Sequence, residues 1–152
     1  MRERERHGTA LARVLELTVL LGEDMRQELG RHGLTPSRMR LLWQLHEQGP
    51  STQRVLAQSL AVSPRNITGL VDALASTGFV TREPHPTDRR ATVVRFTDHG
   101  ARLVAQLHSA REDLAETLFA GIPDDTFTAL VDGLDHVLAQ LRDVLPQQQE
   151  LA

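Results

Sequence analysis

The chain has 152 residues, of which 40% are hydrophobic and 3% aromatic, and its formal net charge is −3. It is long enough for one domain with an aliphatic core, and it has no apolar run of membrane-spanning length and no recognisable signal peptide, so we expect a cytoplasmic protein. Because it contains no cysteine, disulfides, thiolate zinc sites, cysteine nucleophiles and thiol-oxidation switches are excluded.

The first predicted element is a long helix over residues 8–30. Apolar residues recur in it at three- and four-residue steps, and the apolar face is wide enough to be covered on more than one side. The preceding residues 1–7 alternate arginine with glutamate, so we expect a frayed start, and Gly33 is a suitable C-terminal cap.

Three shorter helices are predicted next, each from its cap residue. Thr35 and Ser63 are both followed by proline, and a hydroxyl N-cap before a proline at the first helical position is a strong start signal. Between these two helices, Gly49-Pro50 ends the first, and we expect Ser51 to cap a short helix that reaches Leu60.

The sequence period then changes to that of a β-hairpin. The segments "FVTRE" and "ATVVRF" are rich in β-branched residues and flank a turn with two prolines. Thr97 is expected to cap the next helix, and a break at residues 121–123 separates it from a last helix that ends near Leu145. The tail, residues 146–152, is expected to fray.

The first helix and the last two carry apolar stripes without a core of their own. We therefore predict that a second copy of the chain covers these stripes, in preference to the arms folding back on the same copy. The residues predicted to form this dimer interface are Leu11, Leu15, Leu134, Val137, Leu138, Leu141 and Leu145.

The segment "VLAQSLAVSPRNITGLVDAL" has the spacing of a helix-turn-helix. Ala57 stands where two helices must approach closely, and the second helix would expose Arg65 and Asn66, which can form paired hydrogen bonds to guanine and adenine. Ala61 occupies a turn position often held by glycine, where left-handed backbone costs energy. The segment alone also fits an ordinary helix pair, but the hairpin after it makes a winged helix.

Charge is distributed unevenly along the chain. Residues 37–97 hold eight arginines against four acidic residues, residues 1–36 are balanced, and residues 98–152 carry a net charge of −7. The basic middle segment contains the helix-turn-helix and the hairpin, which favours an anionic partner.

Taken together, these features resemble the MarR family of bacterial transcription regulators over residues 8–145. The resemblance is carried by the pattern "LAxxLxVSxxxITxLVDxLxxxGxV" at residues 56–80 and by the wing "DRRATVVRFTDHG", in which Phe96 replaces the usual leucine. It implies a homodimer with intertwined helical arms, a recognition helix in the major groove and a wing in the adjacent minor groove. It further implies frequent release from DNA by a small phenolic or lipophilic molecule.

On this basis we expect a mainly α fold with a small β-hairpin wing, a winged helix-turn-helix with N- and C-terminal helical dimerisation arms. In a single domain, residues 1–34 form the first arm, 35–97 the DNA-binding region and 98–145 the second arm. Arg90 is the expected minor-groove residue, with Asp88 pairing to a guanidinium of the tip. The candidate DNA contacts are Ser51, Thr52, Arg54, Ser63, Pro64, Arg65, Asn66, Thr68, Arg82, Asp88, Arg89 and Arg90. A candidate ligand cleft consists of Leu17, Leu21, Met39, Trp43 and His46.

An enzyme and a protein-interaction module are the two other classes of function to compare with the sequence. The chain has no nucleophile elbow, phosphate loop or HExxH motif, and His108 and Glu112 lack the further ligands of a zinc site, so we expect no enzyme, metal or cofactor. The alternative is a helical dimeric protein-interaction module without DNA binding. We predict instead a nucleoid-associated regulator, a repressor that binds a palindromic operator in double-stranded DNA as a homodimer, with possible release by a small-molecule effector.

Overall fold

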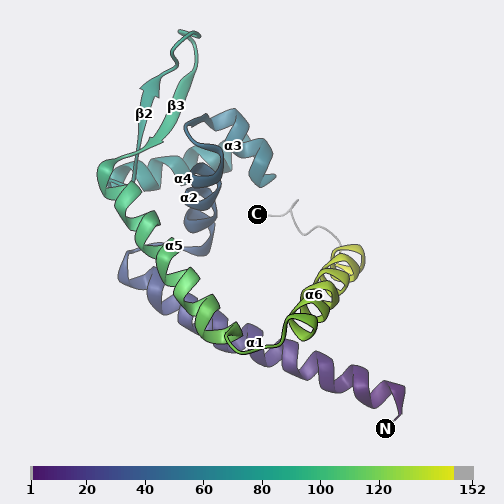
Figure 1. The fold of residues 1–152 in the computed structure, drawn as a ribbon. Coiled ribbons are helices and arrows are strands. Elements are labelled where there is room, and N and C mark those ends of the chain that lie inside the picture. The colour runs from purple at the N-terminus through teal and green to yellow at the C-terminus, as the bar shows by residue number, and fades with distance from the viewer. Residues whose placement is uncertain (1, 146–152) are drawn as a thin grey trace.

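The computed structural model describes residues 2–145 and is mostly helical, with one small antiparallel sheet (Figure 1). The elements in chain order are α1 (Glu3–Arg31), α2 (Pro36–Gln48), β1 (Ser51–Thr52), α3 (Gln53–Leu60), α4 (Pro64–Ser76), β2 (Val80–Pro84), β3 (Thr92–Phe96), α5 (Asp98–Phe119) and α6 (Asp124–Val144). The predicted winged, mainly helical fold is confirmed. The tail that was expected to fray, residues 146–152, lies outside the described residues.

Three of the helices begin at the hydroxyl caps that the sequence predicts. The side-chain oxygen of Thr35 accepts a hydrogen bond from the Arg38 amide at 3.3 Å, and that of Ser63 accepts from the Asn66 amide at 3.1 Å. Thr97 caps α5 in the same way, with 3.0 Å to the Gly100 amide. Each cap satisfies a backbone donor that the first helical turn leaves free.

The start of α1 differs from the expectation. The helix begins at Glu3, and the frayed start expected for residues 1–7 is wrong from that residue onward. The Glu5 carboxylate accepts from the Arg2 amide at 2.9 Å, and acidic side chains in the first turn also suit the positive end of the helix dipole. At the other end the chain leaves the helix through Gly33, whose φ of +66° is the left-handed conformation expected of a glycine cap.

A three-stranded sheet forms the wing and its base. β2 and β3 pair antiparallel from Val80 opposite Phe96 to Pro84 opposite Thr92, and β1 pairs with the other edge of β3, in the order β1-β3-β2. The short strand β1 was not predicted. It also corrects the expected cap of α3, because the Ser51 hydroxyl donates to the Gly49 carbonyl at 2.9 Å. The residue that caps α3 is Thr52, at 3.3 Å from the Val55 amide.

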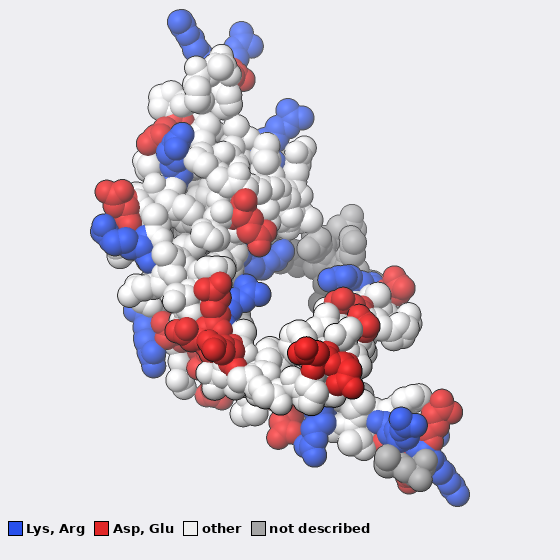
Figure 2. Space-filling model, viewed as in Figure 1, with Lys and Arg blue, Asp and Glu red and all other residues white. Residues whose placement is uncertain are grey.

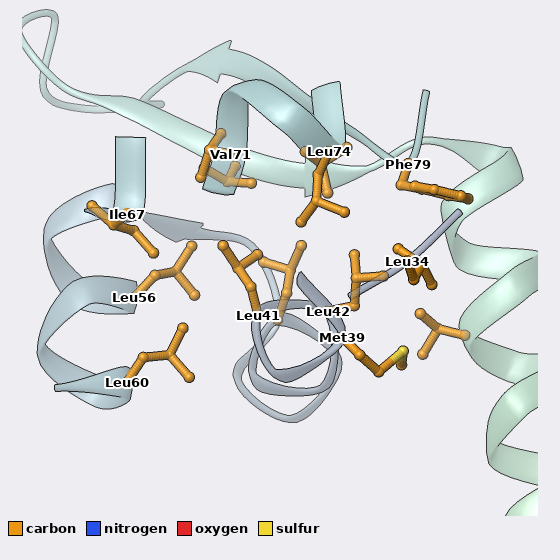
Figure 3. Packing of buried hydrophobic residues seen from close by; sticks show 14 of the residues in the cluster. Leu34, Met39, Leu41, Leu42, Leu56, Leu60, Ile67, Val71, Leu74 and Phe79 are labelled. Carbon is orange, nitrogen blue, oxygen red and sulfur yellow. The ribbon is translucent and has the colours of Figure 1, made fainter. Parts of the chain in front are cut away.

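The buried core lies between α2, α3, α4, the sheet and the first half of α5. Leu41 and Leu42 of α2 are fully buried, and Figure 3 shows Leu41 beside Leu56 of α3, with both leucines facing the side of the core that holds Val71 and Leu74 of α4. These helices present aliphatic faces at helical spacing, so the core consists mostly of leucine and valine, with Met39 and Phe79 also buried, in line with the aliphatic core expected from the composition.

The wing is fastened to α5 by a close backbone contact at Gly100. A Cβ atom on Gly100 would collide with the carbonyl oxygen of Phe79, the residue just before β2. On the same turn, the Thr97 amide donates to the Phe79 carbonyl at 3.1 Å, and the Thr97 hydroxyl donates to the Gly78 carbonyl at 2.5 Å. The combination Thr-x-x-Gly therefore fixes where α5 leaves the sheet.

The two arms carry almost none of this core. Of the described residues, α6 buries none, α5 buries none beyond Leu107, and α1 buries only Leu29. Figure 1 shows α5 running from the base of the wing down to α1, with α6 turning away from both helices. Every residue of the predicted dimer interface is exposed in the single chain, as illustrated by Leu11 at 59% and Leu141 at 48%. No helix within residues 2–145 has the length and apolar character needed to cross a membrane.

Candidate nucleic-acid interface

Helices α3 and α4 form the helix-turn-helix that the sequence predicts. Ala57 of α3 is 6% exposed, and α3 and α4 pack against each other and against α2. The turn between them passes through Ala61, whose φ of +53° makes it the one left-handed residue other than glycine among those described. The expected left-handed turn is therefore present, and Ser63 then caps α4. This local geometry leaves Pro64, Arg65 and Asn66 of the first turn of α4 exposed, while Ile67 of the same turn packs into the core.

On the exposed side of α4, some polar side chains have no hydrogen-bond partner among the described residues, and others are already hydrogen-bonded within the protein. Arg65 and Asn66 are exposed, and within residues 2–145 their side chains make no hydrogen bond or ion pair, so they are available to a ligand. The Thr68 hydroxyl is already hydrogen-bonded, because it donates to the Pro64 carbonyl at 2.9 Å and accepts from the side-chain Nε2 of Gln53 at 3.1 Å. Only its methyl group remains free to contact a base.

Arg82 of β2 is part of a polar network that joins the wing to the helix-turn-helix. Its guanidinium donates to the Asp72 carboxylate of α4 at 2.5 Å and to the Gln53 side-chain oxygen of α3 at 2.8 Å. The same Gln53 donates to Thr68, so three elements meet through one side chain. The candidate DNA contact Arg82 is thus engaged within the protein. Sequence spacing does not reveal this, since 29 residues separate Arg82 from Gln53.

The wing tip presents two free cations. Arg89 and Arg90 lie in the loop between β2 and β3, are exposed, and have no side-chain partner in the described part of the chain. The expected pairing of Asp88 with a guanidinium is not observed. Instead the Asp88 carboxylate accepts a hydrogen bond from the Arg90 backbone amide at 3.0 Å. An aspartate in a turn commonly makes this contact with the amide two residues later in the chain.

The remaining predicted DNA contacts lie near the start of α3 and of α4. Arg54 is exposed on α3 and, like Arg65, has no partner within residues 2–145. Ser51 and Thr52 lie in β1, with their hydroxyls engaged as described, and Ser63 and Pro64 form the capped start of α4. Of the basic residues in this segment, Arg95 is also paired, at 2.7 Å from Glu83 on the neighbouring strand.

Charge is separated over the whole molecule as the sequence predicts. In Figure 2, cationic side chains project from the tip of the wing, where the hairpin of Figure 1 turns. Acidic side chains gather over the lower half of α5 and the start of α6, at the opposite end. Because a polyanion is attracted to the cations of the wing and repelled by the acidic cluster on α5 and α6, this distribution favours DNA at α4 and the hairpin.

The structure brings together only part of the predicted ligand cleft. Trp43 and His46 lie on one surface of α2 with ring centroids 6.1 Å apart, whereas Met39 is buried in the core at 4% exposure. Two residues of α5 join them. The His108 ring lies 5.5 Å from His46, and the Arg111 guanidinium is 5.9 Å from the Trp43 ring. Nothing in the spacing along either helix indicates this meeting, because it depends on how α2 and α5 pack. Leu17 and Leu21 are exposed on α1.

Comparison with known proteins supports the same interpretation. A model of the MarR family matches residues 34–92. An uncharacterized HTH-type transcriptional regulator of Mycobacterium bovis is 36% identical over 110 residues, which cover 71% of this chain and 77% of that protein. The HTH-type transcriptional repressor IacR of Pseudomonas putida is 28% identical over 102 residues, 67% of this chain and 61% of that protein. In fold, the chain is similar to the YusO protein from Bacillus subtilis, with a TM-score of 0.73 at 17% identity over 95% of this chain and 100% of that one.

Proposed function

The chain belongs to the MarR family of transcriptional regulators, and from that premise we propose that it acts as a homodimer that represses transcription at a two-fold symmetric operator. Members of this family are DNA-binding regulators and not enzymes. The observation that carries the proposal is that one chain combines unpaired arginines on α4 and the wing tip with exposed apolar arms at the other end.

The arms, residues 1–34 and 98–145, are assigned to dimerisation. The stripe that contains Leu134, Leu138 and Leu141 is 39–48% exposed in the single chain, which is unfavourable for a helix with no buried residue. A second copy related by a two-fold axis would cover the same stripe on both chains at once. The two recognition helices would then meet half-sites about 34 Å apart, one turn of DNA, on the same face of the duplex.

Residues 35–97 are assigned to DNA binding. We infer that Arg65 and Asn66 form the base-specific hydrogen bonds in the major groove, and that Thr68 contributes its methyl group, since its hydroxyl is engaged. Arg54 and the capped start of α4 supply phosphate contacts, together with Ser51 and Thr52 at the base of the wing. A protein that binds DNA in this way would act at the nucleoid.

The wing tip supplies the second contact, in the minor groove. Arg90 is the minor-groove residue, because Asp88 fixes its backbone amide and so the direction in which its side chain leaves the loop. Arg89 has no such restraint on its amide among the described hydrogen bonds and is assigned to phosphate. Within residues 2–145, no ion pair or side-chain hydrogen bond engages the guanidinium of Arg89 or Arg90.

The matched pair Arg89→Ala and Arg90→Ala tests this assignment. Each variant removes one exposed cation from the same loop, so nonspecific electrostatics change equally in the two. We expect Arg90→Ala to weaken binding to the selected operator by about 2 kcal/mol, and Arg89→Ala by well under 1 kcal/mol. Thermal midpoints should remain those of the parent in both. Equal losses in operator affinity would show that the tip acts as a general charge.

The operator itself is obtained by selecting bound sequences from a random duplex pool. A two-fold symmetric site, bound with an affinity that falls steeply as salt is raised, supports the proposal. An affinity independent of salt would instead favour the protein-interaction module. Repression is supported by the name of the Pseudomonas relative, and it is measured by placing the selected site between a promoter and a reporter gene. Increased reporter output on expression of the protein would identify an activator.

Release by a small molecule is the last part of the proposal. Trp43, His46, His108 and Arg111 offer an aromatic wall and a cation at the junction of the DNA-binding region and the arm, where a bound molecule would alter the spacing of the two recognition helices. Trp43 is the only tryptophan, so its fluorescence reports on that surface alone. Compounds that release the operator without changing Trp43 emission would place the effector elsewhere.

A further inference from the structure

The wing tip contains a second organising side chain besides Asp88. His85 follows the last residue of β2, and its Nδ1 atom accepts from the backbone amides of Thr87 at 3.2 Å and Asp88 at 3.0 Å. The Thr87 hydroxyl lies 3.3 Å from the same nitrogen. The His85 amide in turn donates to the Ala91 carbonyl at 3.1 Å and closes the loop.

These contacts define the form of the imidazole. Two amide N–H groups point at Nδ1, so this nitrogen must present its lone pair, and the ring proton of the neutral form must be on Nε2. A doubly protonated imidazole has no acceptor. It would place an N–H against two N–H donors, and both amides would lose their partner. The observed turn therefore requires neutral His85.

We propose that His85 is a positioning residue of the wing: its neutral imidazole holds the loop in the conformation that presents Arg90 to DNA. The Asp88 carboxylate holds the Arg90 amide, and the His85 ring in turn holds the Asp88 amide. His85 therefore supports the contact that Asp88 makes with Arg90. The proposal rests on the assignment of the wing tip to DNA under the proposed function.

Removing the acceptor atom of His85 is therefore expected to release the turn, whereas a side chain that offers an acceptor at the same place is expected to keep it. The charged groups near the ring are Asp88, Arg89 and Arg90 in the same loop and the ion pair of Glu83 with Arg95 on the strands. The loop lies at the end of the hairpin that is far from the helices (Figure 1).

The first experiment compares the free protein with two variants by NMR at a single pH. We expect the amides of Thr87 and Asp88 to lose order in His85→Ala, measured by their heteronuclear NOE. The matched variant is His85→Asn, because an asparagine side chain offers an acceptor to the same amides. His85→Asn should keep both amides ordered. Unchanged order of the two amides in His85→Ala would overturn the proposal.

The second experiment measures the effect of Arg90→Ala on operator affinity in the same backgrounds. With His85 present, the loss should be roughly thirtyfold, as for a positioned arginine contact, and only a fewfold in the His85→Ala background. In the His85→Asn background the loss should match that in the parent. An equal loss in the parent and His85→Ala backgrounds would contradict the positioning role. If Arg90→Ala has no effect under any condition, the minor-groove assignment fails, and the NMR result still decides the role of His85.

Discussion

Replacing Arg82 by alanine distinguishes two possible roles of this residue, a contact with DNA phosphate or a contact that positions the wing. As a phosphate contact, Arg82 would contribute to affinity and to its salt dependence but not to folding. As a positioning residue, it would contribute to folding and leave the salt dependence unchanged. Its contacts with Asp72 at 2.5 Å and Gln53 at 2.8 Å favour the second reading, because its charge already has a partner.

The size of the effect follows from the exposure of the partners. The side chains of Arg82 and Asp72 are 32% and 61% exposed, so their ion pair belongs with surface pairs that contribute about 0.5 kcal/mol. The hydrogen bond to Gln53 adds about 0.5–1 kcal/mol. Arg82→Ala should therefore lower the free energy of unfolding by about 1–1.5 kcal/mol. For a chain of this size the thermal midpoint falls by roughly 3–5 °C.

Two measurements then decide between the readings. Thermal unfolding is compared at a fixed protein concentration, since a dimer's midpoint depends on concentration, and operator affinity is measured across a salt series. Arg54→Ala is the matched control, because Arg54 is exposed without a described partner; its midpoint should stay constant while the salt slope becomes shallower by about one. If Arg82→Ala behaves like Arg54→Ala, the positioning role is refuted.

Three further predictions concern stability and assembly. Gly100→Ala should cost about 3 kcal/mol in chemical denaturation, since the new methyl group would collide with the Phe79 carbonyl; a parental midpoint would mean that the sheet yields easily. Ala61→Gly should stabilise by about 0.5–1 kcal/mol, the left-handed strain of about 1–2 kcal/mol less the entropy of glycine, and a loss of stability would contradict this. Leu141→Asp should give monomers in sedimentation equilibrium and abolish operator binding, whereas Val55→Asp, an exposed apolar residue outside the arms, should leave the mass of the dimer unchanged.

Those parts of the fold that depend on neighbouring residues could be predicted from the sequence. Thr35, Ser63 and Thr97 act within three residues of themselves, so each helix start is visible in the chain. Alternating β-branched residues likewise revealed the hairpin. The two-residue strand β1 was missed because no period can be recognised in two residues, and it changed the cap of α3 from Ser51 to Thr52.

The candidate site was predicted less completely, because its residues meet through tertiary contacts. Arg65 and Arg82 look alike in the sequence, but only the fold distinguishes the free guanidinium from the one paired to Asp72. The meeting of Trp43 with His108 depends on the angle between α2 and α5, which no spacing within one helix reveals. The contact of His85 is not evident from the sequence, because histidine is not a usual turn cap and its role requires the amides of the next residues to turn back toward it.

The short strand β1 also bears on how regulation can work. Thr52 pairs with Val93 of the wing and, through its side chain, starts the first helix of the helix-turn-helix. Together with the contacts of Arg82, this joins the base of the hairpin to both helices of the helix-turn-helix. In the proposed dimer, an effector would therefore act on the distance between the two DNA-binding regions and not on the shape of one of them. A change in that distance would shift the recognition helix and the wing of one region together, so both would leave their grooves at the same time.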